Sequence, residues 1–144
     1  MLAYNFFTDE EKKRIAEAIR TAELETSGEI CLHVEGNCKV DVLDCAAYWF
    51  KKLNMHQTAL RNGVLFYLAV NDHKFAIIGD AGINSKVPDD FWENIKEHMR
   101  LKFKEGLFAD ALVDGILMAG DQLKTHFPYQ NGDINELSDD ISFG

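Results

Sequence analysis

The segment that decides the fold runs from Arg61 to Trp92 and reads RNGVLFYLAVNDHKFAIIGDAGINSKVPDDFW. It holds two apolar runs, Val64 to Val70 and Phe75 to Ile78, which are separated by the polar corner Asn71-Asp72-His73. Both runs are short, rich in Val, Ile, Phe and Tyr, and bounded by Gly, Asn and Asp, as is typical of buried strands. Neither run alternates cleanly between apolar and polar residues. We therefore expect a β-hairpin in a sheet that is covered on both faces.

The open end of this hairpin is the candidate functional site. A short corner makes the two strands antiparallel, so the start of the first strand and the end of the second lie side by side. The loops Arg61 to Gly63 and Gly79 to Asn84 should therefore meet at one end of the sheet. This geometry makes Asn62 and Asp80 neighbours.

Length and charge limit the possible partners. The chain has 144 residues, with 15 basic and 24 acidic side chains and a formal net charge of -9. We expect a single domain over residues 1–128, followed by an acidic tail over residues 129–144 that is mobile or loosely docked. An acidic surface repels phosphate backbones and anionic lipids, so nucleic acid is disfavoured as a partner. A divalent metal ion and an unidentified protein are the partners that the composition allows.

The cysteines and the amino terminus bear on the cellular compartment. Cys31, Cys38 and Cys45 show no zinc-ligand spacing and no CxxC pattern. Three such cysteines are most simply reduced thiols. The first eight residues are too short for a signal peptide, and no apolar stretch reaches the length of a membrane span. We expect a soluble, cytoplasmic protein without membrane insertion.

The elements before the hairpin predict a parallel crossover. Thr8 and Glu11 form a capping box that should begin a helix running into the mid-twenties. Period-two alternation predicts a strand from Glu29 to Glu35. A second helix, from about Asp41 to Leu53, has the length that a connection between two parallel strands needs. The start of the Glu29 strand then lies at the same sheet end as Asn62.

The segments after the hairpin predict two more helices. Pro88-Asp89-Asp90 is a typical helix start, and Gly106 is a typical end. A last helix is expected from about Phe108 to His126, before Pro128. Together these elements predict an α/β fold, a three-layer αβα sandwich. Its small mixed sheet combines the parallel crossover with the antiparallel hairpin, and helices cover both faces.

Six oxygen-bearing residues are collected by this topology at or near one end of the sheet. They are Glu29, Asn62, Asp80, Asn84, Asp89 and Asp90. Carboxylate and amide oxygens are the ligands that Ca²⁺ takes in proteins, and Mg²⁺ is the second choice, so we expect a divalent-cation site. Two alternatives stay open. The acids could be structural caps of turns and helices, or they could hold a metal that activates water in a phosphomonoesterase. No standard phosphatase motif occurs, so no catalytic residue is assigned.

Four segments together resemble the TPM-domain family, which is named for a thylakoid-lumen protein of photosystem II repair. They are Ser27-Gly28-Glu29-Ile30, Arg61-Asn62-Gly63-Val64-Leu65, the hairpin end Ile77 to Asn84, and Pro88-Asp89-Asp90-Phe91-Trp92. The resemblance covers about residues 5–128. It implies a small αβα sandwich, with the acid phosphatase activity and calcium binding reported in the plant branch.

The resemblance also assigns positions and shows departures. It places the family's Asn-Gly motif on Asn62 and Gly63, its glycine motif on Gly79 and Gly82, and its acidic positions on Glu29, Asp80, Asp89 and Asp90. Arg61 stands where the family often has Asp, and Asp80 follows Gly79 where the family often has Tyr. The arginine could exclude a metal, pair with Asp80 or bind an anion. Most relatives carry a signal peptide and a membrane segment, and neither is expected in this sequence. A soluble, cytoplasmic branch of the family would explain this difference.

Overall fold

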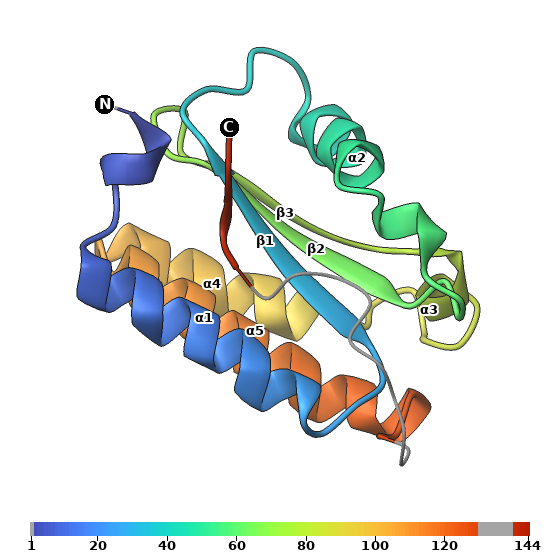
Figure 1. The fold of residues 1–144 in the computed structure, drawn as a ribbon. Coiled ribbons are helices and arrows are strands. Elements are labelled where there is room, and N and C mark those ends of the chain that lie inside the picture. Colours follow the sequence, from blue (N-terminus) through green and yellow to red (C-terminus); the bar gives the residue numbers. More distant parts are fainter. Residues whose placement is uncertain (1, 130–139) are drawn as a thin grey trace.

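A four-stranded sheet forms the centre of the computed structural model, which describes residues 2–129 and 140–144. The strand order is β3-β2-β1-β4 (Figure 1). Strand β1 (Glu29–Glu35) runs parallel to β2 (Gly63–Ala69), and β2 runs antiparallel to β3 (Lys74–Gly79). Every residue of β2 is buried, as expected for a strand covered on both faces. The predicted hairpin and parallel crossover are both confirmed.

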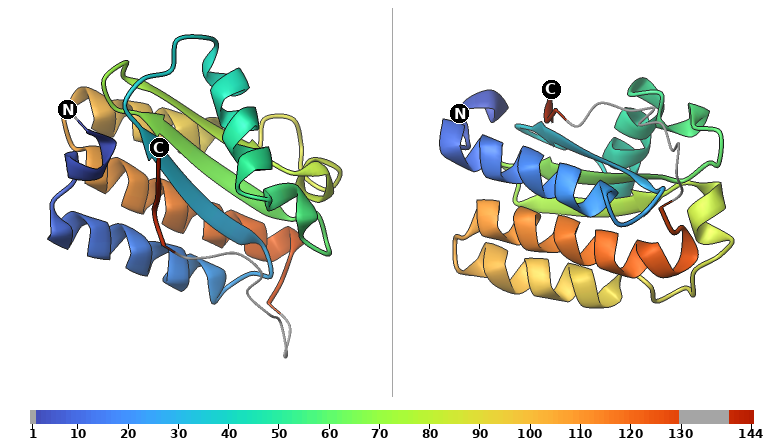
Figure 2. Two further views of the ribbon diagram at one scale, coloured as in Figure 1. Left: turned by 45° about the horizontal axis from the view of Figure 1, so that its top comes forward. Right: turned by 60° about the horizontal axis from the view of Figure 1, so that its bottom comes forward.

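The helices form a layer on each face of the sheet. Helices α1 (Asp9–Glu23), α4 (Glu93–Lys104) and α5 (Phe108–His126) cover one face, and α2 (Val42–Lys52) covers the other (Figures 1 and 2). We call these the three-helix face and the α2 face. The arrangement confirms the expected three-layer αβα sandwich.

Local capping explains where the first two long helices begin. The Thr8 hydroxyl accepts a hydrogen bond from the Glu11 N–H, and the Glu11 carboxylate accepts one from the Thr8 N–H. This reciprocal pair satisfies two backbone donors that a helix start would leave unpaired. The Asp41 carboxylate similarly accepts from the Leu43 N–H at 2.8 Å and caps α2.

Alternation along the strands divides the core into two apolar clusters. Ile30, Leu32 and Val34 of β1 face the three-helix cluster, whereas Cys31 faces the α2 cluster. In β2, Val64, Phe66 and Leu68 take the first side and Leu65, Tyr67 and Ala69 take the second. Successive strand residues point to opposite faces, so each face can be followed residue by residue to the candidate site.

The segment after β3 differs from the prediction. A short helix, α3 (Ala81–Asn84), follows the hairpin, and α4 begins at Glu93 rather than near Pro88. The Phe91 N–H donates to the Pro88 carbonyl and the Glu93 N–H donates to the Asp90 carbonyl, so these residues form turns before the helix. Trp92, not Asp89, is the N-cap of α4, and it makes no side-chain cap. Two short 3-10 helices, η1 (Ala3–Asn5) and η2 (Met55–Gln57), were also not predicted.

The end of the chain adds a strand to the sheet. Strand β4 (Ser142–Phe143) runs parallel to β1, with Ser142 opposite His33 and Phe143 opposite Val34. The Phe143 ring also packs against the Tyr4 ring, with centroids 5.1 Å apart. We expected a tail that is mobile or loosely docked. Its last residues instead pair with the sheet edge, and residues 130–139 lie outside the described part of the chain.

The cysteine prediction was wrong for two of the three residues. Cys38 and Cys45 form a disulfide, and Cys31 is a free, buried cysteine. Cys38 lies in the loop between β1 and α2, and Cys45 lies in the first turn of α2. The expected cytoplasmic location rested in part on reduced thiols and loses that support. Among the described residues, no helix combines the length and the apolar character that a membrane crossing requires.

Candidate functional site

The two predicted loops meet at the open end of the hairpin. The Asp80 N–H donates to the Gly63 carbonyl and the Gly82 N–H donates to the Arg61 carbonyl, both at 2.9 Å. The contact at Gly82 is so close that a Cβ there would lie 2.2 Å from the Leu60 carbonyl oxygen. Only glycine fits this approach, because it has no Cβ. The loop end is therefore a closely joined structure.

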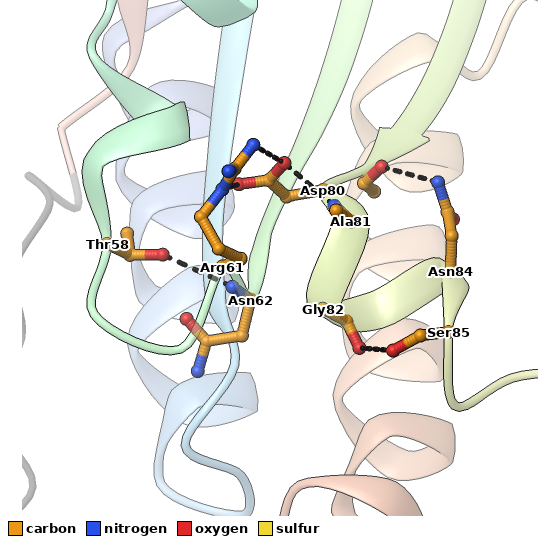
Figure 3. Close-up of polar contacts among 9 residues, drawn as sticks. Thr58, Arg61, Asn62, Asp80, Ala81, Gly82, Asn84 and Ser85 are labelled. Atoms are coloured by element: carbon orange, nitrogen blue, oxygen red, sulfur yellow. Dashed lines mark hydrogen bonds and ion pairs between the residues drawn. The ribbon is translucent and has the colours of Figure 1, made fainter.

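Asp80 is the centre of the polar contacts at this end. Arg61 binds its carboxylate through two hydrogen bonds, Nε to Oδ2 at 2.6 Å and a terminal nitrogen to Oδ1 at 2.7 Å (Figure 3). Asp80 Oδ1 also accepts from the Ala81 N–H at 2.7 Å and thereby caps α3. Arg61 takes part from a left-handed backbone conformation, with φ 50°. Of the three roles considered for Arg61, the structure shows the pairing with Asp80.

The two partners differ in exposure, and their charges support each other. Asp80 is only 6% exposed, whereas half of the Arg61 side chain, 51%, is in contact with solvent. Burial acts to raise the pKa of Asp80, but the hydrogen bonds from Arg61 and Ala81 outweigh it and lower that pKa. The hydrogen bond to Asp80 in turn raises the pKa of Arg61. Asp80 is thus a buried carboxylate held in its charged form by a cation that solvent can reach.

Glu29 lies on the same face of the sheet as Asp80. In the strand register Glu29 is opposite Gly63, and the Asp80 N–H binds the Gly63 carbonyl, so the two acids flank a residue without a side chain. Neighbouring strands are about 4.8 Å apart, which places the two backbones about 10 Å from each other. Glu29 is buried, at 5% exposure. Met55 lies over Gly63, since a Cβ there would be 3.1 Å from the Met55 carbonyl oxygen.

Asn62 is a neighbour of Asp80 in the backbone, but its side chain points away from it (Figure 3). It precedes Val64 by two residues and so follows the three-helix face. Its Nδ2 donates to the Ser27 carbonyl at 2.8 Å, and its N–H donates to the Thr58 hydroxyl at 3.2 Å. The amide Oδ1 is buried and accepts no hydrogen bond from the described residues. This oxygen is a candidate ligand separate from Asp80.

Of the other three predicted ligands, Asn84 is the last residue of α3, and Asp89 and Asp90 lie in the turns that follow it. Asn84 and Asp89 line one small pocket of about 130 Å³, next to the Trp92 ring. The Asn84 amide donates to the Gly79 carbonyl at 3.1 Å, on the side of α3 away from Arg61 (Figure 3). Asp90 is exposed and does not line this pocket. The six residues therefore divide into the Glu29–Asp80 pair, Asn62, the Asn84–Asp89 pocket and Asp90.

This division limits what the site can hold. Within residues 2–129 and 140–144, no three His, Cys, Asp or Glu side chains are grouped so that they could bind a metal ion. The sequence reasoning placed Asp80 and Asn62 together but did not follow the side chains to opposite faces. It also did not single out His56, whose charge acts to lower the pKa of Asp80. The opposite faces of Asn62 and Asp80 follow from the alternation of strand residues once Val64 is known to pair with Gly79.

Comparisons with known proteins agree with the fold. The family model TPM_phosphatase, described as TPM domain, matches residues 3–122. The solution structure of protein BA42 from the psychrophilic bacterium Bizionia argentinensis is similar, with a TM-score of 0.92 and 49% identity over 97% of each chain. No curated protein matches the chain.

Two more distant structures share the fold alone. The N-terminal domain of a protein from P. gingivalis has a TM-score of 0.72 and 15% identity, over 88% of this chain and 83% of that one. The N-terminal domain of the cg2496 protein from Corynebacterium glutamicum has a TM-score of 0.66 and 11% identity, over 87% and 79%. The match of the family model over most of the chain, together with the 49% identity to BA42, shows that the chain belongs to the TPM-domain family.

Proposed function

We propose that the loop end binds a divalent cation, with Ca²⁺ as the better-suited ion and Mg²⁺ as the second, and that Asp80 is its principal ligand. The observation that carries the proposal is the Arg61–Asp80 pair. A carboxylate that is 6% exposed stays charged because a cation lies against it. That cation belongs to a side chain that is 51% exposed and so can move into water. A metal ion could then take its place.

The donors near Asp80 suit a calcium ion better than a zinc ion. Glu29 supplies a second buried carboxylate on the same face, across Gly63. With two carboxylates, the remaining ligands would be carbonyl oxygens and water, which Ca²⁺ accepts in a flexible geometry. Mg²⁺ demands a stricter octahedral arrangement and gives up its water less readily. We therefore expect weak binding that is selective for Ca²⁺ over Mg²⁺.

The proposal stops at binding. Hydrolysis of a phosphate ester by metal-bound water would need groups that hold the ester and the leaving oxygen beside these two carboxylates. No feature of the described residues favours that reaction over binding. Of the six predicted ligands, we keep Asp80 and Glu29 as the main candidates and the Asn62 amide oxygen as the next.

Competition between Arg61 and the metal gives a specific test. In a Ca²⁺ titration followed by amide NMR, we expect saturable shifts at Gly63, Asp80 and Gly82. Arg61→Asn should strengthen Ca²⁺ binding, because the competing guanidinium is gone and asparagine tolerates the left-handed backbone. Asp80→Asn should abolish the shifts with the fold retained. A purely structural role for the pair would not make the arginine variant bind better.

A second arginine–aspartate pair provides the matched control. Arg14 binds Asp110 at 2.6 Å between α1 and α5, on the three-helix side. Arg14→Asn and Asp110→Asn remove the same charges without touching the loop end, so neither should change the Ca²⁺ titration. The proposal is overturned if millimolar Ca²⁺ leaves the three loop amides unshifted in both the unmodified protein and Arg61→Asn.

A further inference from the structure

A separate cleft lies at the other end of the sheet, where the β2–β3 turn meets the carboxyl-terminal half of α4. Figure 1 shows this turn at the opposite end of the hairpin from α3. The cleft has a volume of about 370 Å³. That size lies within the range of small-molecule sites in proteins. Nothing in the loop-end proposal uses it.

Aromatic and aliphatic side chains form the floor of the cleft. Leu68 of β2 is buried at its base, and Phe75, Phe103 and Phe108 complete the apolar lining. The rings of Phe75 and Phe103 contact edge to face with centroids 4.9 Å apart, and those of Phe103 and Phe108 are 5.4 Å apart. The three phenylalanines are only partly buried. They hold one another in place and leave an apolar surface open to a ligand.

Basic side chains and a histidine form the rest of the lining. They are His73, Lys74, Arg100 and Lys104, and none of the described residues that line the cleft is acidic. This concentration of positive charge is unexpected in a chain whose formal net charge is -9. It makes the cleft attractive to an anion, because the lining charges act at short range whereas solvent screens those farther away.

The four polar residues are not equally available. The Lys74 ammonium donates to the Cys38 and Val40 carbonyls, at 3.1 and 3.3 Å, and so is not available to a ligand in the cleft. Arg100 pairs with Glu97 one helical turn earlier, in an exposed contact that contributes little. Lys104 is exposed and forms no ion pair with any described residue. It is the cation best placed to meet an incoming negative charge.

We propose that this cleft binds a small amphiphilic carboxylate, with an aromatic or short alkyl body against the phenylalanine floor and the carboxylate at Lys104 and Arg100. The apolar floor supplies most of the affinity through burial of the ligand's body. The basic rim supplies the selectivity for an anion over a neutral or cationic molecule of the same shape. Charge complementarity and the apolar floor both point to this class of ligand.

Three isosteric probes test the proposal: phenylpropanoate, phenylpropanol and phenylpropylamine. In amide NMR titrations we expect saturable shifts over residues 68–75 and 100–108, with affinity falling in that order. Lys104→Gln should weaken phenylpropanoate binding about threefold to fivefold, the effect of one exposed ion pair, and leave phenylpropanol binding unchanged. Phe103→Leu should weaken both ligands, because it removes part of the floor that they share.

The matched control is Lys13→Gln, which removes an exposed lysine of α1 that does not line the cleft. It should leave all three titrations unchanged. Equal affinity for the carboxylate and the alcohol, together with no effect of Lys104→Gln, would overturn the proposal and leave an unselective apolar cleft. Absence of any shift, or shifts only at residues 61–64 and 79–84, would overturn it as well. Because those two regions are separate, failure here is distinguishable from failure of the calcium proposal.

Discussion

The two faces of the sheet are stabilised by different means. The three-helix face is a broad apolar core in which α1, α4 and α5 bury aliphatic side chains such as Ile116. The α2 face is covered by a single long helix and has a smaller apolar cluster. It also holds the disulfide and the buried ionisable residues His33, Glu29 and Asp80. Sensitivity to pH and to reducing agents should therefore be concentrated on the α2 face.

His33 shows how a titratable side chain is buried there without a charge. It is completely buried, and its ring stacks on Trp49 with centroids 3.7 Å apart. Its Nδ1 lies 2.8 Å from the Ser142 hydroxyl, whereas Nε2 has no hydrogen-bond partner among the described residues. Burial disfavours the charged imidazolium and lowers the pKa of His33 to about 4. Asp80 is the opposite case, because its hydrogen bonds to Arg61 keep the buried carboxylate charged.

The largest effect is expected from a cavity on the three-helix face. Ile116→Ala removes a completely buried side chain from α5 and should reduce the free energy of unfolding by about 2 to 5 kcal/mol. Denaturant unfolding at pH 7 and at pH 5 measures this loss, which should be the same at both values. Ile116→Val, with an expected loss of about 1 kcal/mol, is the conservative control. A loss that depends on pH would contradict the idea that pH sensitivity is concentrated on the α2 face.

Protonation of His33 should give the next largest effect. The folded pKa of about 4 lies below the unfolded value of 6.5, so the unfolded chain binds a proton first as the pH falls. The contribution of neutral His33 to the free energy of unfolding is therefore fully present above pH 6.5. It declines as the pH falls to 4, by about 3 kcal/mol in total. His33→Phe should remove this pH dependence, whereas the exposed His73→Gln should keep it. An unchanged slope in His33→Phe would contradict the prediction.

The disulfide should contribute a comparable but smaller amount. Cys38 and Cys45 are seven residues apart, and closing a loop of that size stabilises a fold by roughly 2 to 3 kcal/mol in the chain-entropy model. Reductant should therefore lower the unfolding midpoint of the unmodified protein. The double variant Cys38→Ser/Cys45→Ser should unfold at the lower midpoint and show no further response. Equal midpoints with and without reductant would show that the bridge does not stabilise the fold.

The smallest effect is expected at the Arg61–Asp80 pair, because half of the arginine is already in water. Removing the guanidinium in Arg61→Asn should raise the pKa of Asp80, since its lowering depends on that hydrogen bond. The lowered pKa gives stability that is present above the unfolded value and is lost as the pH falls through the folded value. Carboxyl NMR titration measures the change. Arg14→Asn should leave the Asp80 titration unaltered, and an equal change there would mean that long-range charge dominates.

Much of the fold could be predicted because its determinants are local. The hairpin is encoded by two apolar runs around a polar corner, and the parallel crossover follows from a helix of sufficient length between two strands. α3 could not be found in this way, because four residues are too few to show a helical period. β4 has only two residues and depends on contacts with β1 and Tyr4 that are distant in sequence.

The candidate site could be predicted only in part. The meeting of the two loops follows from antiparallel pairing, and Asp80 and Arg61 lie in those loops. Asn62 and Asp80 point to opposite faces because successive strand residues alternate. This can be worked out only when the exact pairing of Val64 with Gly79 is known. The disulfide joins the loop before α2 to the first turn of that helix, a contact that no spacing rule predicts. Geometry across strands was therefore the missing information.

The contact at Gly82 has a consequence for identifying related proteins. Backbone oxygens of Leu60 and Arg61 occupy the space of a side chain at this position, at 2.2 and 2.6 Å from where its Cβ would lie. Any relative that joins its two loops in the same way must keep glycine here, whatever it binds. A homologue with alanine or a larger residue at the aligned position must open the loops. Gly82 is thus a marker by which genomes can be sorted into chains that share this loop architecture and chains that have replaced it.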